Sequence, residues 1–238
     1  MGEPLLKISG LMSGYGDVQV LWGIDVAVNE GELACLVGSN GAGKTTLMRT
    51  ISGICTATGG STHFNGVDIT SASPNAILSA GIAHVPEGRR LFRGLTVKDN
   101  LLLGAYLRKD KDAIEQDLER VYDLFPILRE RRRQDATTMS GGQQQMCAIA
   151  RGIMSRPKLL MIDELSLGLA PKLVEELAET LVEINKQGTT IILVEQDVMT
   201  AFELADYAFV VETGKVMKAG PTSELIDDPI IREAYLGM

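Results

Sequence analysis

The segment GSNGAGKTT at 38–46 is the part of the chain whose residue types most directly predict a chemistry. Gly38, Gly43, Lys44 and Thr45 satisfy the pattern G-x-x-x-x-G-K-S/T, in which glycines let backbone N–H groups turn towards phosphate oxygens. Lys44 would reach the β- and γ-phosphates of a nucleotide, and the hydroxyl of Thr45 would be a ligand of Mg²⁺. The residues expected to contact the nucleotide are Gly38, Ser39, Asn40, Gly41, Ala42, Gly43, Lys44, Thr45 and Thr46.

A second candidate site lies at the end of the apolar run LLMIDE, residues 159–164. Its composition predicts a buried parallel strand, and α/β sheets bind their ligands at the carboxyl ends of such strands. Asp163 would bind the metal ion, and Glu164 would orient and deprotonate the attacking water. With Lys44 these groups suffice for phosphoryl transfer to water, because that reaction needs mainly positioning and neutralisation of charge.

The elements that flank these two sites predict an α/β core. The apolar segment 32–37 is expected to be a strand that leads into the glycine-rich loop, and 45–53 after it has a helical pattern. That strand–loop–helix order is the context that a phosphate-binding loop requires. Strands expected within 4–30 and about 61–69, the latter with the hairpin signal Asn65–Gly66, would form an antiparallel sheet beside the nucleotide.

A helical subdomain of approximately residues 87–156 is predicted to be inserted into a single domain that spans residues 1–238. Thr96 and Asp99 have the spacing of a capping box at the start of the helix-forming run LLLGAYL. Further along, apolar residues at helical spacing predict a face turned towards the core: Ile114, Leu118, Val121 and Phe125.

The segment TMSGGQQQMCAIAR, residues 138–151, does not belong to phosphate-binding proteins in general. Its serine and two glycines precede a helical stretch, so free N–H groups at a positive helix end would form a second anion site. One nucleotide cannot use two such sites that lie far apart in one fold. The segment resembles the signature of ATP-binding cassette (ABC) ATPases, and the resemblance covers essentially all 238 residues.

The resemblance implies a P-loop NTPase core, and a head-to-tail dimer in which each signature caps the ATP held by the Lys44 of the other subunit. It also implies that Tyr15 stacks on adenine, and that the loop 166–171 contacts the active site of the partner. Leu165 stands before that loop where the family usually has a proline, which leaves the loop less rigid at its start. The signature residues expected to contact ATP are Ser140, Gly141, Gly142 and Gln143.

Two further positions depart from the usual pattern of the family. Glu87 stands where a glutamine usually contacts Mg²⁺ and the transmembrane partner, and a carboxylate there can still be a metal ligand. Gln196 stands where a histidine usually contacts the γ-phosphate, and the two histidines of the chain, His63 and His84, both precede the signature. We therefore expect Glu164 alone to carry out the acid–base chemistry, while Gln196 senses the γ-phosphate through a hydrogen bond.

These departures are themselves informative about the subfamily. PEGRR followed by LF, then LTVKDNL, VEQ and the terminal AYLG, resembles the smaller of the two ATPase subunits of bacterial branched-chain amino acid importers. Urea and short-amide importers are similar, but they more often have PQG at Pro86–Gly88, which favours the amino acid importer. The resemblance implies permease subunits, a second ABC ATPase subunit (identical or not) and a separate solute-binding protein as partners.

Two other classes of function remain as alternatives. A soluble ABC ATPase that acts on DNA or ribosomes would usually have two cassettes or a long coiled coil between the phosphate-binding loop and the signature, and this chain has neither. A small-molecule kinase or GTPase built on the loop alone would leave SGGQQQ and SLGLAP unexplained.

Bulk properties agree with a transport ATPase. The net charge of −8 disfavours nucleic acid as a partner, since a nucleic-acid-binding protein usually has a basic face. No apolar run approaches the ~18 residues of a membrane span, and the first residues do not have the pattern of a signal peptide. We therefore expect a peripheral protein on the cytoplasmic face of the bacterial inner membrane, with ATP and Mg²⁺ as cofactors.

Overall fold

The computed structural model describes residues 2–236, and its larger sheet has six strands in the order β10-β9-β3-β8-β7-β6. Five of them run parallel, and β10 pairs antiparallel with β9. Every residue of β3, β7 and β8 is buried, as expected of strands covered on both faces. The strands are β3 (Leu33–Val37), β6 (Ile82–Val85), β7 (Leu159–Asp163), β8 (Thr190–Glu195), β9 (Tyr207–Glu212) and β10 (Lys215–Pro221).

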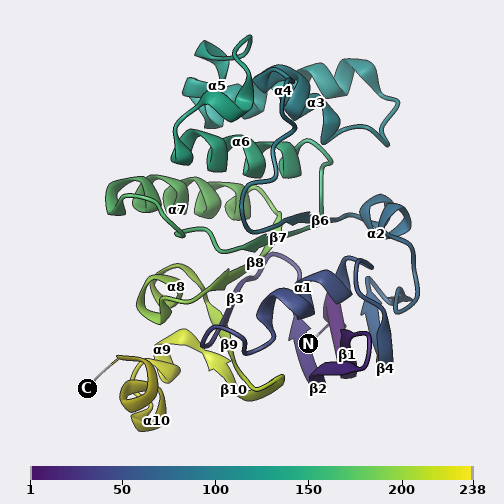
Figure 1. Cartoon of the computed structure of the whole chain (residues 1–238), viewed down its shortest axis with the longest axis vertical. Helices are drawn as coiled ribbons and strands as arrows, with labels where there is room; N and C mark the ends of the chain where they lie inside the picture. The colour runs from purple at the N-terminus through teal and green to yellow at the C-terminus, as the bar shows by residue number, and fades with distance from the viewer. Residues whose placement is uncertain (1, 237–238) are drawn as a thin grey trace.

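Because parallel strands end at the same edge of a sheet, the segments that follow them meet there. The glycine-rich loop follows β3, Asp163 ends β7, and Glu195 ends β8. The order of the strands thus brings the two sites predicted from the sequence to one edge of the larger sheet (Figure 1). Helix α1 (Lys44–Ile51) begins directly after the loop and packs against strands of both sheets.

The smaller sheet is antiparallel, as predicted, with the order β2-β1-β4-β5. Its first two strands stay paired over most of their length, with several register shifts around Gly10 and Gly23, which have positive φ angles. Asn65 and Gly66 also have positive φ angles, which the predicted two-residue hairpin turn requires. The strands are β1 (Leu6–Tyr15), β2 (Val18–Val28), β4 (Ala57–Phe64) and β5 (Val67–Asp68).

The helices between β6 and β7 form a separate layer, at the top of Figure 1. The apolar face predicted from helical spacing points inward: Leu118, Val121 and Phe125 are buried, and Ile114 packs against the same core. The layer contains α3 (Val97–Leu103), α4 (Lys111–Leu124), α5 (Pro126–Glu130), the short 3₁₀ turn η1 (Ala136–Thr138) and α6 (Gly141–Ile153).

Helix α3 begins as predicted and ends earlier than predicted. Thr96 and Asp99 form the capping box, with the Thr96 hydroxyl accepting a hydrogen bond from the Asp99 N–H at 3.1 Å. The helix ends before the residues GAYL, which form turns. At Gly104 the chain comes so close to α6 that a Cβ atom there would lie 1.9 Å from the carbonyl oxygen of Arg151. Only glycine is compatible with that approach.

The remaining helices cover the larger sheet. Leu177, Leu181 and Ile184 of α7 are buried in the same apolar cluster as residues of β7 and β8, so this helix packs one face on the sheet. These helices are α2 (Pro74–Ala80), α7 (Pro171–Lys186), α8 (Val198–Leu204), α9 (Thr222–Leu225) and α10 (Pro229–Ile231), followed by the π-helical turn η2 (Arg232–Leu236).

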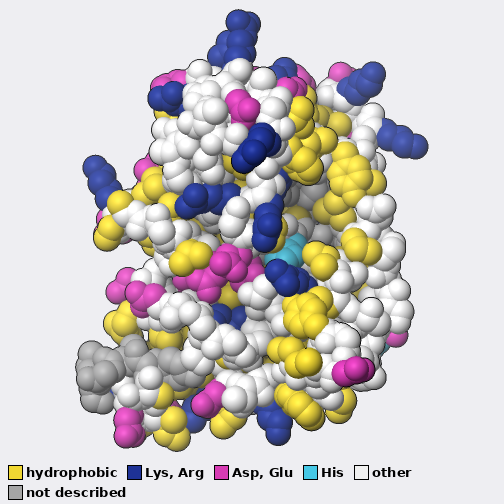
Figure 2. Space-filling model, viewed as in Figure 1, with side chains coloured by type: hydrophobic (Ala, Val, Ile, Leu, Met, Phe, Trp, Pro, Cys, Tyr) yellow, Lys and Arg dark blue, Asp and Glu magenta, His cyan; other side chains and the backbone are white. Residues whose placement is uncertain are grey.

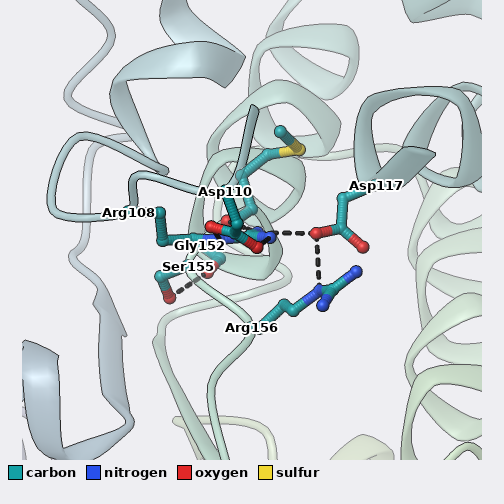
Figure 3. A network of polar contacts seen from close by, with 7 residues as sticks. Arg108, Asp110, Asp117, Gly152, Ser155 and Arg156 are labelled. Atoms are coloured by element: carbon teal, nitrogen blue, oxygen red, sulfur yellow. Dashed lines mark hydrogen bonds and ion pairs between the residues drawn. The ribbon is translucent and has the colours of Figure 1, made fainter. Parts of the chain in front are cut away.

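A buried carboxylate holds the helical layer together (Figure 3). Asp117 on α4 accepts hydrogen bonds from Arg108 and Arg156, both at 2.6 Å. Arg108 also donates to Asp110 and to the carbonyl oxygen of Met154, just after α6. Because the Asp117 side chain is only 9% exposed, its contacts with the two guanidinium groups are shielded from water.

We expect Asp117→Asn to lower the free energy of unfolding by about 1–3 kcal/mol, because the amide lacks the negative charge with which Oδ2 pairs with two guanidinium groups. Urea unfolding of the purified chain measures this. Glu115→Gln on the same helix is the matched control: its side chain is 62% exposed and lies 3.9 Å from Lys98. An exposed pair contributes ~0.5 kcal/mol, so equal losses in the two variants would contradict the structural role of Asp117.

Candidate active site

A cavity of about 460 Å³ opens at the carboxyl edge of the larger sheet. The glycine-rich loop 40–46 forms much of its wall. The structure therefore brings Lys44, Thr45, Glu87, Glu164 and Gln196 to one cavity, as the sequence predicted for a nucleotide site. The lining residues outside the loop are Val20, Glu87, Glu164, Leu167 and Gln196.

The backbone of the loop is arranged to accept an anion. At Gly38 a Cβ atom would lie 2.1 Å from the carbonyl oxygen of Val211, so no other residue fits there. Gly43 precedes α1 with φ of 108°, and no side chain caps the first N–H groups of the helix. Uncapped N–H groups at a helix N-terminus, behind a glycine-rich turn, are the arrangement that binds phosphate.

The ammonium group of Lys44 lies inside this loop. The side chain is buried, and its Nζ donates to the carbonyl oxygens of Gly38 at 2.6 Å and Ser39 at 3.2 Å. Burial lowers the pKa of Lys44, while the nearby carboxylates of Glu164 and Asp163 oppose that shift. A cation held by backbone carbonyl oxygens inside the loop is already positioned to neutralise the phosphates of a nucleotide.

Asp163 and Thr45 present two oxygen ligands side by side. The Thr45 hydroxyl donates to Oδ1 of Asp163 at 3.3 Å, whereas Oδ2 is buried and has no hydrogen-bond partner within the described part of the chain. Burial raises the pKa of Asp163 to about 6, and the negative charges of Glu164 and Glu87 add to that effect. An unpartnered buried carboxylate oxygen beside a hydroxyl fits Mg²⁺, which takes oxygen ligands.

Glu164 is held in a sparsely populated backbone conformation. Its φ is 60°, and its N–H donates to the carbonyl oxygen of Val194 at 3.0 Å. Burial raises the pKa of its carboxyl group, and the charge of Glu195 raises it further. A carboxyl group with a raised pKa that lines the cavity has the properties of a general base for an attacking water. Gln196 lines the same cavity from the neighbouring strand.

The signature residues lie outside this cavity. Ser140 caps α6 and forms a capping box with Gln143, through contacts of 3.3 and 3.4 Å. Gly142 is packed closely: a Cβ there would lie 1.7 Å from Leu173, whereas one at Gly141 would lie 3.0 Å from the flexible guanidinium of Arg89. The N-terminus of α6 therefore lies outside the cavity formed by the glycine-rich loop, and its role as a second anion site stays a prediction.

Tyr15 lies beside the loop, on the last residue of β1, without lining the cavity. Its hydroxyl is 3.4 Å from the hydroxyl of Thr46 and accepts a hydrogen bond from Arg49 at 3.2 Å. The side chain is 44% exposed, so one face of the ring is accessible. Its stacking on adenine stays a prediction.

The sequence reasoning missed one charged residue close to the site. Glu195 ends β8 and is fully buried, and its charge acts on both Glu164 and Lys44. The sequence contained a pattern that could have identified Glu195, because TIILVE is an apolar run that ends on an acidic residue, as LLMID does. Figure 2 shows acidic side chains gathered in the middle of one face, with Lys and Arg side chains beside them.

Comparison with known proteins decides the family. A family model described as ABC transporter matches residues 21–166. BraG of Pseudomonas aeruginosa, a high-affinity branched-chain amino acid transport ATP-binding protein, is 42% identical over 98% of this chain and 100% of BraG. The chain belongs to the ABC transporter family. BraF, another branched-chain amino acid transport ATP-binding protein of that bacterium, is 29% identical to this ABC ATPase over 100% of the chain and 99% of BraF.

The fold of this ABC ATPase agrees with the comparison. The solved structure of cbiO1 from Clostridium perfringens, part of the ABC transporter complex cbiONQ, has a TM-score of 0.84 and 28% identity. The match covers 99% of this chain and 96% of that one. The predicted α/β core with an antiparallel sheet and inserted helices is confirmed, and the chain is an ATP-binding subunit that hydrolyses ATP for transport. Within residues 2–236 no helix is both long enough and apolar enough to cross a membrane.

Proposed function

We propose that this ABC ATPase powers a bacterial importer of branched-chain amino acids. The identity of 42% to BraG carries the proposal, because it spans both proteins and exceeds the 29% identity to BraF of the same bacterium. The difference also supports assignment to the smaller of two ATPase subunits. A urea or short-amide importer remains the second candidate, since Glu87 is the main residue that separates the two patterns.

The geometry supports a division of roles within the cavity. Lys44 and the N–H groups of the loop would bind the β- and γ-phosphates of ATP, and Glu164 would deprotonate the attacking water. Thr45 and Asp163, with Glu87 at the rim, would hold Mg²⁺, which neutralises phosphate charge when bound. Gln196 would donate a hydrogen bond to the γ-phosphate, because an amide can sense that group but cannot carry its proton.

The exposed signature supports a dimer that closes on ATP. The N-terminus of α6 is a second anion site outside the cavity, and a head-to-tail partner would bring its own ATP to Ser140 and the two glycines after it. Closure of the two cassettes would pull on the permease, and hydrolysis would reopen them. The second cassette is another copy of this chain or a BraF-like subunit.

A groove between the core and the helical layer supports contact with a permease. It has a volume of about 640 Å³, and Phe92 and Tyr106 on its walls are 52% and 56% exposed. Pro86, next to Glu87, lines the same groove, so a segment bound there would contact the loop that ends in the active site. Such a contact would hold the chain on the cytoplasmic face of the inner membrane, and a separate solute-binding protein would deliver the amino acid to the permease.

Uptake of labelled leucine and labelled urea tests the assignment, in cells whose only copy of the chain has Lys44→Ala. We expect leucine uptake to fall to background and urea uptake to be unchanged, because this variant removes the cation that binds phosphate. Lys186→Ala, an exposed lysine at the end of α7, is the control and should leave both unchanged. Loss of urea uptake alone would move the protein to the amide importers, and loss of neither would contradict both assignments.

A further inference from the structure

Glu195 is a carboxylate buried at the end of the central strand β8. It is 0% exposed, and it follows five buried residues of that strand. Among residues 2–236, no Lys or Arg nitrogen lies within 4.0 Å of its oxygens. A buried charge without a cation is unfavourable unless hydrogen bonds compensate for the lost water.

The compensating hydrogen bonds come from one short segment. The backbone N–H of Ser166 donates to Oε1 of Glu195 at 2.9 Å, and the Ser166 hydroxyl donates to Oε2 at 2.8 Å. Burial raises the pKa of Glu195, and these two contacts, with the backbone N–H groups of Gln196 and Leu165, oppose that shift. Glu195 therefore joins the end of β8 to the turn that follows β7.

That turn contains the proposed general base and is strained. Glu164 has φ of 60°, which is unfavourable for a residue with a Cβ and persists only when the surroundings enforce it. The next residue is Leu165, which lacks the fixed φ that a proline would supply. The two hydrogen bonds from Ser166 fix the turn on its far side, and the Glu164 N–H bond to Val194 fixes it on the near side.

We propose that Glu195 is a positioning residue for hydrolysis, which clamps Ser166 so that the Glu164 carboxylate is held towards the cavity. The clamp also fixes the first residue of the loop 166–171, which the dimer would place against the partner's ATP. The inference rests on the proposed role of Glu164 as general base. Glu195 itself is sealed from the cavity by burial and contacts no reacting atom.

The role predicts a change in kcat without a change in ATP binding. In the purified full chain, Glu195→Ala should lower kcat about 10- to 100-fold, since a misplaced catalytic group costs about that much. KM and Kd for ATP should stay within about twofold, because the phosphate contacts of Lys44 and the loop are untouched. Glu195→Gln should recover most of kcat, because its amide oxygen still accepts the Ser166 N–H.

Ser166→Ala completes the test, because the two residues are expected to act as a unit. The Ser166→Ala variant should lower kcat by less than Glu195→Ala, and the double variant should be no slower than Glu195→Ala alone. If Glu195→Ala does not fold, Ser166→Ala alone tests the clamp from its other side, because it removes the hydroxyl contact and should lower kcat at unchanged KM. Glu179→Ala, an exposed residue of α7, is the matched control and should retain the wild-type kcat.

Three results would overturn the clamp: a rise in KM with unchanged kcat, a Glu195→Gln variant as slow as Glu195→Ala, or fully additive effects of the two residues. The Glu164→Gln variant shows whether the clamp proposal or the proposed role of Glu164 as general base is wrong. If Glu164→Gln keeps full kcat, the role of Glu164 is wrong whatever the Glu195 variants do. If Glu164→Gln is inactive and the Glu195 variants are fast, only the clamp is wrong.

Discussion

Glu164→Gln is expected to lower the rate of ATP hydrolysis by about 10²- to 10⁴-fold, because the substitution removes the group that accepts the proton of the attacking water. The amide is nearly the same size as the carboxylate, so the backbone conformation at φ of 60° should be preserved. Burial raises the pKa of Glu164, and Glu195 adds to the shift, which strengthens the carboxylate as a base compared with an exposed glutamate. An amide has no comparable basicity.

ATP binding by this variant should be retained, and the closed dimer should therefore accumulate. The phosphate contacts of Lys44 and the loop do not involve Glu164, and loss of one negative charge from the cavity favours a bound triphosphate. Size-exclusion chromatography with ATP and Mg²⁺ measures the dimer, and phosphate release measures the rate. A species that stays monomeric with ATP would contradict the head-to-tail dimer, and one that hydrolyses ATP at the wild-type rate would contradict the role of the base.

Glu176→Gln is the matched control for this experiment. Glu176 lies on the exposed side of α7, away from the cavity, and undergoes the same chemical change. It should hydrolyse ATP at the wild-type rate and form no stable dimer. A dimer that forms equally in both variants would reflect the loss of surface charge rather than a blocked step in hydrolysis.

The glycine-rich loop could be predicted from the sequence because its turn into the following helix depends on residues that are close together in the chain. The spacing of Gly38, Gly43 and Lys44 determines how the loop turns into α1, and the structure shows each glycine in a backbone conformation or a contact that other residues cannot adopt. Asp163 and Glu164 were also predictable, because an apolar run that ends on acidic residues places them at the functional edge of a parallel sheet.

The features that escaped prediction depend on contacts between distant segments. Glu195 is 29 residues from Ser166 in the sequence, so the contact follows from the pairing of β7 with β8 and not from any local pattern. The need for glycine at position 104 likewise depends on the approach of that residue to α6. Nothing in either segment alone indicates the position of its neighbour.

The glycines of the signature show a third case, in which the sequence indicated the right residues for an incomplete reason. They were singled out as a source of free N–H groups, and the structure adds a steric constraint at Gly142 from Leu173. Arg151 of α6 donates hydrogen bonds to the carbonyl oxygens of Arg89 and Arg90, so the loop that contains Glu87 contacts the helix that bears the signature.

Lys44→Ala is expected to weaken ATP binding by about 10- to 100-fold and to abolish measurable hydrolysis. A hydrogen bond to a charged group contributes about 1.5–3 kcal/mol, and that range corresponds to this loss of affinity. The side chain is buried in the loop, so no other lysine can replace it within the cavity. Its removal also leaves the carboxylates of Asp163 and Glu164 without their nearest cation, which further disfavours an anionic ligand.

Titration with a fluorescent ATP analogue measures the affinity, and Ser140→Arg provides the comparison. Ser140 lies outside the cavity of its own chain, so its variant should bind the analogue with wild-type affinity while it fails to form the ATP-dependent dimer. Lys44→Ala should fail at the earlier step. Equal losses of affinity in the two variants would mean that the signature contributes to the nucleotide site of its own chain. The proposal that the glycine-rich loop binds ATP and the signature caps the ATP of the partner would then be wrong.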